Sequence, residues 1–134
     1  MKIGVFDSGV GGLSVANAIS KALPEQEVIL REDKEHVPYG NRQPSEIVGF
    51  VIPILQELID SGCQIIVVAC NTVSTTLIEE LRQRFPGTKL IAVEPMIKSA
   101  AALTKNKIIA VCATPATLGS SRYAELKSNY AKDI

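Results

Sequence analysis

The sequence lacks tryptophan and shows no excess of charge, because its 14 basic residues balance 14 acidic ones. Zero net charge without a basic run argues against a nucleic-acid-binding surface. No apolar segment reaches the roughly 18 uninterrupted residues that a membrane-spanning helix requires. The residues after Met1 enter a predicted strand, which argues against a signal peptide. We therefore expect neither nucleic acid nor a membrane as a partner.

Cysteine is also scarce, and the three cysteines Cys63, Cys70 and Cys112 have no C-x-x-C spacing. An odd number of cysteines without that spacing argues against a disulfide framework and against a zinc site. We expect reduced thiols in a cytoplasmic protein and no metal-ligand cluster. The only histidine, His36, lies in a charged loop of the kind that usually forms solvated surface.

Five short apolar segments alternate with helical patterns along the 134 residues. The predicted strands are Lys2–Phe6, Glu27–Arg31, Gln64–Ala69, Lys89–Val93 and Lys107–Cys112. This order predicts an α/β fold, with an open parallel sheet, helices on both of its faces and right-handed crossovers. No strand follows the last helical pattern to close the unit that begins at Lys107, so we expect an incomplete domain, with a complete doubly wound domain as the alternative.

The most informative stretch runs from the predicted strand Gln64–Ala69 through Cys70 into a helix that extends to Phe85. Asn71 and Thr72 are both suitable residues for capping that helix. Open α/β sheets bind their ligands at the carboxyl ends of the strands. A helix start also favours a thiolate, which is a stronger base and nucleophile than a thiol. A buried, inert core cysteine is an equally supported alternative.

A second loop, Asp7-Ser8-Gly9, follows the first predicted strand. Its carboxylate can orient an ammonium group, and its hydroxyl and backbone N–H groups can bind an anion. Its glycines do not have the G-x-G-x-x-G spacing of dinucleotide-binding loops, and no P-loop lysine follows. A turn with an aspartate helix cap explains this loop slightly better when it is considered alone.

A third loop, Pro38-Tyr39-Gly40, presents a rigid aromatic side chain that could form the wall of a pocket. An ordinary turn is the simpler explanation of this tripeptide. Thr114 and Thr117 add hydroxyl groups after the fifth predicted strand, where helix capping is the alternative role. Together, the three loops and these threonines predict a small polar pocket with one thiol and one carboxylate.

These segments, in this order and spacing, resemble the amino-terminal half of the glutamate racemases. The matching segments are Ile3–Leu13, Val37–Gly40, Ala69–Thr72, Val93–Pro95 and Ala113–Leu118. The related aspartate racemases share Cys-Asn-Thr but do not usually begin with Asp-Ser-Gly-Val-Gly-Gly. The family has two similar α/β domains with the active site between them. The resemblance therefore implies a first racemase-type domain over residues 1–95 and the beginning of a second, truncated one over residues 96–134.

The resemblance also implies cofactor-independent and metal-independent interconversion of L- and D-glutamate by two cysteines on opposite faces of the α-carbon. Inversion needs two groups because the proton returns to the face opposite the one it left. Cys70 would be one of them, and Asp7 and Ser8 would hold the substrate amino group and assist the thiol. The remaining expected substrate contacts are Pro38, Tyr39, Gly40, Asn71, Thr72, Thr114 and Thr117. D-Glutamate feeds peptidoglycan synthesis, which implies a bacterial cytoplasm.

Two departures from the family pattern concern cysteine. The family's second catalytic cysteine lies in a Gly-Cys-Thr-His segment that this sequence does not contain. Cys112 stands where the family commonly has an aliphatic residue, so we expect it to be a core thiol. Two alternatives therefore stay open: a non-catalytic half-racemase that binds a small ligand or a protein, and a one-base enzyme that uses Cys70 alone, such as a lyase or decarboxylase. An incomplete domain exposes apolar surface, so we also expect self-association.

Overall fold

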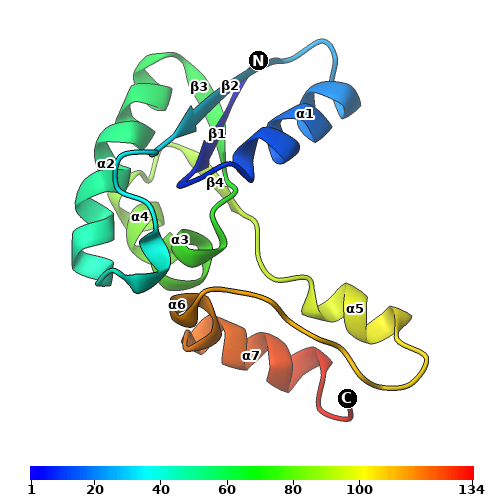
Figure 1. Ribbon diagram of the computed structural model, residues 1–134. Helices are drawn as coiled ribbons and strands as arrows, with labels where there is room; N and C mark the ends of the chain where they lie inside the picture. The colour runs from blue at the N-terminus through cyan, green and yellow to red at the C-terminus, as the bar shows by residue number, and fades with distance from the viewer.

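The computed structural model describes all residues, 1–134, and contains one parallel four-stranded sheet (Figure 1). Its strands are β1 (Lys2–Asp7), β2 (Glu27–Glu32), β3 (Cys63–Val68) and β4 (Lys89–Ala92), in the spatial order β2-β1-β3-β4. In the centre of the sheet, Phe6 of β1 pairs with Val68 of β3. The predicted parallel α/β sheet is therefore confirmed, and the loops that follow β1 and β3 leave the sheet side by side.

Seven α-helices and one short 3-10 helix, η1 (Tyr39–Asn41), connect and cover the strands. The α-helices are α1 (Gly12–Ala22), α2 (Pro44–Asp60), α3 (Asn71–Thr76), α4 (Ile78–Arg84), α5 (Ile97–Leu103), α6 (Pro115–Leu118) and α7 (Ser121–Tyr130). None of them combines the length and the apolar composition that crossing a membrane would require.

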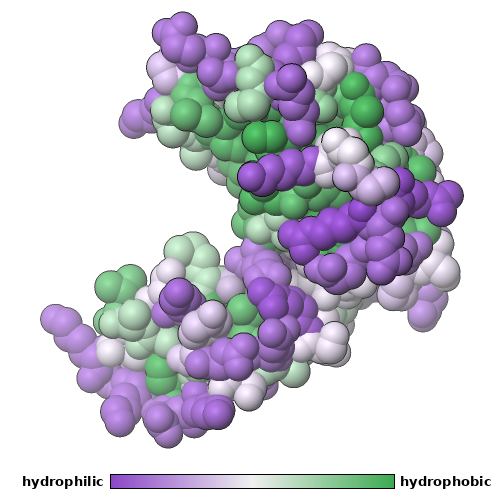
Figure 2. Space-filling view, turned by 180° about the vertical axis from the view of Figure 1, so that it is seen from behind, coloured by the Kyte–Doolittle hydropathy of each residue, from purple (hydrophilic) through white to green (hydrophobic).

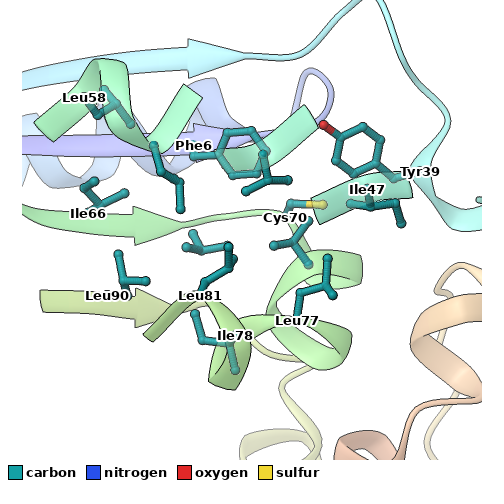
Figure 3. Close-up of a cluster of buried hydrophobic side chains, with 14 of the residues drawn as sticks. Phe6, Tyr39, Ile47, Leu58, Ile66, Cys70, Leu77, Ile78, Leu81 and Leu90 are labelled. Carbon is teal, nitrogen blue, oxygen red and sulfur yellow. The ribbon is translucent and has the colours of Figure 1, made fainter. Parts of the chain in front are cut away.

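The hydrophobic core has two parts, one on each face of the sheet. Successive side chains of a strand point to opposite faces, so Val5 packs with Ala16 of α1, whereas Phe6 belongs to the larger cluster on the other face. That larger cluster includes Leu58 of α2 and Leu81 of α4 (Figure 3). Helices on both faces, as the alternating pattern predicted, therefore fix the strand ends from which the site residues project.

The predicted helix after Cys70 is divided into α3 and α4 at Leu77, where φ is −128° and ψ is −7°. Thr75 Oγ1 donates to the Asn71 carbonyl at 2.8 Å, and Thr76 Oγ1 donates to the Thr72 carbonyl at 2.6 Å. Such bonds from threonine to the preceding turn compete with regular helix geometry and bend helices. Leu77 is itself buried in the large core cluster, so the break directs an apolar side chain inward.

The prediction of a fifth strand over Lys107–Cys112 was wrong, because this segment has no regular secondary structure and pairs with no strand. A strand needs a neighbour to satisfy its backbone N–H and C=O groups. The segment lies beside α5 and α7, away from the sheet (Figure 1), and its Ile109 and Val111 pack on a separate small cluster. Its backbone therefore has no strand edge within reach.

The molecule consequently has two lobes. We call β1–β4 with α1–α4 the sheet lobe, and α5–α7 with the segment between α5 and α6 the helical lobe. The helical lobe has its own apolar cluster, formed by Ile97, Tyr123 and Leu126, and it contacts the sheet lobe chiefly through α3. A hollow separates the two lobes on the face shown in Figure 2.

Candidate functional site

A cavity of about 470 Å³ lies between the lobes, at the carboxyl ends of β1 and β3. Seven of the ten predicted site residues line it: Asp7, Ser8, Cys70, Asn71 and Thr72 from the sheet lobe, and Thr114 and Thr117 from the helical lobe. The remainder of the wall includes apolar side chains of α5 and of residues 110–113, which lie between α5 and α6. The structure thus brings the loops that follow β1 and β3 together with the two threonines.

Cys70 occupies the N-cap position of α3 and is 4% exposed. Its Sγ lies 3.2 Å from the hydroxyl oxygen of Ser8. Burial raises the pKa of the Cys70 thiol above its ordinary value; the hydrogen bond with Ser8 acts in the opposite direction, and the charge of Asp7 adds to the increase. The backbone N–H of Val73 at the start of α3 also lowers this pKa, as the sequence predicted, but desolvation of the charged sulfur is the larger effect. Asn71 and Thr72 were predicted to be suitable caps for this helix, but both lie inside α3 and neither caps it.

Asp7 ends β1 and is 7% exposed. Its Oδ2 accepts hydrogen bonds from the backbone N–H groups of Gly12, at 2.9 Å, and Gly9, at 3.2 Å. The loop can approach the carboxylate so closely because Gly12 has no side chain: an added Cβ would lie 2.6 Å from the Asp7 Cβ. Both of these bonds go to Oδ2, and the residue also lines the cavity.

Hydroxyl groups join the two lobes at the cavity wall. Thr72 Oγ1 and Thr114 Oγ1 are 2.9 Å apart, and Thr114 Oγ1 donates to Thr117 Oγ1 at 3.1 Å. Thr114 also caps α6 by accepting a hydrogen bond from the Thr117 backbone N–H. The capping role and the predicted position in the pocket therefore coexist at Thr114.

The remaining predicted residues, Pro38, Tyr39 and Gly40, do not line the cavity. Tyr39 is 2% exposed and belongs to the same core cluster as Cys70 (Figure 3). Gly40 packs directly against the helical lobe, since an added Cβ would lie 2.5 Å from the Cβ of Thr114. The tripeptide thus supports the cavity wall from behind.

Sequence analysis missed a buried carboxylate, Asp33, which is 6% exposed. Its Oδ2 accepts a hydrogen bond from the Tyr39 hydroxyl at 2.6 Å, and both of its oxygens lie 2.9 Å from His36 Nδ1. Burial by itself would raise the pKa of Asp33, but the hydrogen bonds from Tyr39 and His36 outweigh it and hold the pKa below its usual value. His36 also stacks on Phe50 of α2, with ring centroids 3.8 Å apart, so its ring is packed against the sheet lobe and is not simply solvated. The spacing of Asp33, three residues before His36 and six before Tyr39, is the sequence signal for this network.

Cys112 was predicted to be a core thiol, and this prediction was wrong: the residue is exposed and lines the cavity. The reason is the absence of the fifth strand, which would have buried every second side chain of this segment. No group of three or more histidine, cysteine, aspartate or glutamate side chains is arranged to hold a metal ion.

Comparison with known proteins finds a family and several relatives that match nearly the whole chain. The family model described as Asp/Glu/Hydantoin racemase matches residues 3–131. A glutamate racemase of Pseudomonas aeruginosa (strain UCBPP-PA14) is 42% identical over 132 residues, which is 98% of this chain and 50% of that protein. The chain thus spans about half the length of the curated relatives it matches.

Solved structures agree with the sequence comparison. Glutamate racemase from Aquifex pyrophilus superimposes with a TM-score of 0.86 at 38% identity, covering 96% of this chain and 51% of that one. Glutamate racemase from Thermus thermophilus, in complex with β-chloro-D-alanine, gives a TM-score of 0.78 at 35% identity, covering 93% of this chain and 48% of that one. The fold of this chain is therefore shared with about half of each of these two structures.

Proposed function

We propose that this chain, which belongs to the Asp/Glu/Hydantoin racemase family, forms part of a glutamate racemase that interconverts L- and D-glutamate. The observation that carries the proposal is the meeting of Asp7, Ser8 and Cys70 in one cavity at the carboxyl ends of neighbouring strands. D-Glutamate supplies peptidoglycan synthesis in this family, so the proposed setting is a bacterial cytoplasm.

The cavity can hold a small amino acid with a charge at each end. Asp7 would bind the substrate ammonium group through Oδ1, because its Oδ2 already accepts two backbone hydrogen bonds. Asn71, Thr72 and Thr117 would donate hydrogen bonds to the carboxylates, since all three line the same cavity. This division places the α-carbon between the carboxylate of Asp7 and the thiol of Cys70.

Cys70 would act as the base that removes the α-proton. Its thiolate would take the proton and become a thiol, and the electron pair would stay on the α-carbon, delocalised into the adjacent carboxylate. Because the charge of Asp7 contributes to the raised pKa of Cys70, an ammonium group bound to Asp7 would offset that contribution. Substrate binding would thus promote the deprotonation that the reaction requires.

Inversion also needs an acid on the opposite face of the α-carbon. In our proposal that acid lies outside residues 1–134, in the part of the relatives that this chain does not match. The sheet lobe would then correspond to the first domain, residues 1–95, and the helical lobe to the start of a second, residues 96–134. Leu103 and Ile108 are 79% and 72% exposed on the helical lobe, which supports self-association of the chain as it stands.

The loop Pro38-Tyr39-Gly40 would act indirectly in this scheme. Tyr39 would hold the buried Asp33, and Gly40 would allow the close contact that positions Thr114. Any direct contact of this loop with substrate would require a different arrangement of the two lobes.

The test uses L-glutamate in heavy water, with the loss of the α-proton signal followed by NMR and the product analysed by chiral chromatography. We expect slow α-deuterium exchange without racemisation, because one thiolate can return deuterium to the face from which it took the proton. Cys70→Ser should abolish exchange, since a hydroxyl is far less acidic than a thiol.

Cys112→Ser is the matched control, because Cys112 lines the same cavity but has no assigned role. It should exchange at the rate of the unaltered chain. Exchange that survives Cys70→Ser would exclude Cys70 as the base. Formation of D-glutamate that is lost in Cys112→Ser would identify Cys112 as the second acid. Binding of glutamate without any exchange would favour the alternative of a non-catalytic binding module.

A further inference from the structure

A bidentate ion pair connects the two lobes, and neither of its residues lines the cavity. Arg122 of α7 donates from Nε to Glu94 Oε1 at 2.6 Å and from Nη2 to Glu94 Oε2 at 2.9 Å. Its Nη1 donates to Glu125 Oε2, one turn along the same helix, at 2.8 Å. The pKa of the Arg122 guanidinium is raised, chiefly by its hydrogen bonds to Glu94 and Glu125. The pair lines a polar groove between α4 and α7 that does not contain Cys70.

Glu94 is fixed to the sheet lobe. The backbone N–H of Val93 donates to the Val68 carbonyl at 3.0 Å, which continues the pairing of β3 with β4 by one residue. Glu94 follows immediately, at the start of the linker to α5. Its position is therefore set by the sheet, and its carboxylate offers a fixed point against which the helical lobe can be held.

Arg122 is fixed to the part of the helical lobe that lines the cavity. It is the second residue of α7, whose N-cap Ser120 donates from Oγ to the Thr117 carbonyl at 2.7 Å. Thr117 in turn accepts from Thr114 at the cavity wall. A displacement of Arg122 relative to Glu94 would therefore move both threonines relative to Cys70.

We propose that Arg122 is a positioning residue. Its bidentate ion pair with Glu94 holds the helical lobe against the sheet lobe and thereby sets the width of the cavity that contains Cys70. The inference rests on the proposed function for its meaning in catalysis, but its geometry can be tested without substrate. The hydroxyl pair Thr72–Thr114 restrains the lobes at the cavity, and the ion pair adds a second restraint at another point. Two separated restraints fix an orientation that one alone leaves free to rotate.

The expected effect is moderate, because the side chains of Arg122 and Glu94 are 40% and 24% exposed. Exposed single ion pairs contribute little, whereas bidentate guanidinium–carboxylate pairs are stronger and geometrically specific. We therefore expect loss of the pair to raise access to Cys70 by about threefold to tenfold. Added salt should weaken the pair in the unaltered chain, since both groups are partly solvated.

The test measures alkylation of Cys70 by a small reagent, iodoacetamide, and a bulky one, fluorescein maleimide, with each cysteine quantified by peptide mass spectrometry. Arg122→Gln should raise the rate at which the bulky reagent labels Cys70 by threefold or more. The pH profile of labelling by the small reagent should not change. A role in overall stability alone would not separate the two reagents. High salt should raise the rate of Cys70 labelling by the bulky reagent in the unaltered chain and have little effect on that rate in the variant.

Arg82→Gln is the matched control, because Arg82 lines the same groove but pairs with Glu79 within α4; it should behave as the unaltered chain. The double exchange Glu94→Arg with Arg122→Glu should restore slow labelling at least in part. If Arg122→Gln loses helical circular dichroism, Arg122→Lys takes its place as the test variant. Lysine keeps the charge but cannot form the bidentate hydrogen bonds, so Cys70 should be labelled at an intermediate rate. Unchanged labelling of Cys70 by the bulky reagent in a folded variant overturns the inference. Failure of glutamate turnover would leave this result unaffected, so the two proposals fail separately.

Discussion

The hydrogen bond between Ser8 and Cys70 gives a prediction for the reactivity of the thiol. The Ser8 hydroxyl can donate to a thiolate at Sγ, 3.2 Å away, and it lowers the pKa of Cys70 against the larger effect of burial. Ser8→Ala removes this donor and puts no new charge in the cavity. The variant should therefore have a higher pKa at Cys70 and less thiolate at neutral pH.

The magnitude follows from the strength of hydrogen bonds to charged groups. Such bonds contribute about 1.5–3 kcal/mol, and we take the lower end because sulfur is a diffuse acceptor. The thiolate population at neutral pH then falls about tenfold, since roughly 1.4 kcal/mol corresponds to a factor of ten. A less acidic thiol gives a more reactive thiolate, with a Brønsted coefficient of about 0.4–0.5. The observed rate should therefore fall only about threefold at neutral pH and rise about threefold where both thiols are ionised.

The assay is the rate of Cys70 carboxamidomethylation by iodoacetamide from neutral to strongly alkaline pH, resolved by peptide mass spectrometry. The profiles of Ser8→Ala and the unaltered chain should cross, with the variant slower at neutral pH and faster at high pH. Cys112 provides an internal control because it is exposed and forms no bond with Ser8. Profiles that coincide, or that differ by one factor at every pH, would refute the assignment of the Ser8 bond to the thiolate.

Two further predictions concern the loop behind the cavity. Tyr39→Phe removes the 2.6 Å donor to Asp33 and should lower the free energy of unfolding by about 1–3 kcal/mol at neutral pH. Because the folded state lowers the pKa of Asp33, its stabilisation is present above the unfolded pKa and is lost as pH falls through the folded one. Urea titrations should therefore show a smaller loss of the free energy of unfolding on acidification in the variant than in the unaltered chain. An equal loss in the two proteins would contradict this. Gly40→Ala places a methyl group 2.5 Å from the Thr114 Cβ and should cost about 1–3 kcal/mol, whereas Gly87→Ala, with no atom within 4 Å, should cost little in the same titrations.

The sequence predicted the sheet lobe well because its signals are local. Each strand of the sheet is four to six residues long and contains a short apolar segment, which polar or charged residues precede. The order of strands and helices then restricts the topology to parallel pairing. Lys107–Cys112 has a similar local signal and forms no strand, because pairing depends on where the rest of the chain places a free edge. That information is not in the segment itself.

The candidate site divides in the same way. Asp7, Ser8 and Cys70 were predicted from their places at strand ends, and the parallel sheet brings these places together. Thr114 and Thr117 reach the same cavity from the helical lobe, although the strand predicted to precede them does not form. Tyr39 could not be placed this way, because its position depends on Asp33, a carboxylate that appears in the sequence as one of several charges in a loop. A buried carboxylate and a solvated one have the same letter, and only the fold distinguishes them.

The acidity of Cys70 shows why the chemistry of such a site cannot be read from a local motif. The motif supplies two influences that favour a thiolate, the start of α3 and the neighbouring hydroxyl of Ser8. Burial acts in the other direction and is larger, because moving a charge out of water costs more than one hydrogen bond returns. Burial comes from the core residues of α2 and α3 that pack around the end of β3, far from Ser8 in the sequence. Because the charge of Asp7 contributes to the raised pKa, an ammonium group bound to Asp7 would act directly on the acidity of the thiol.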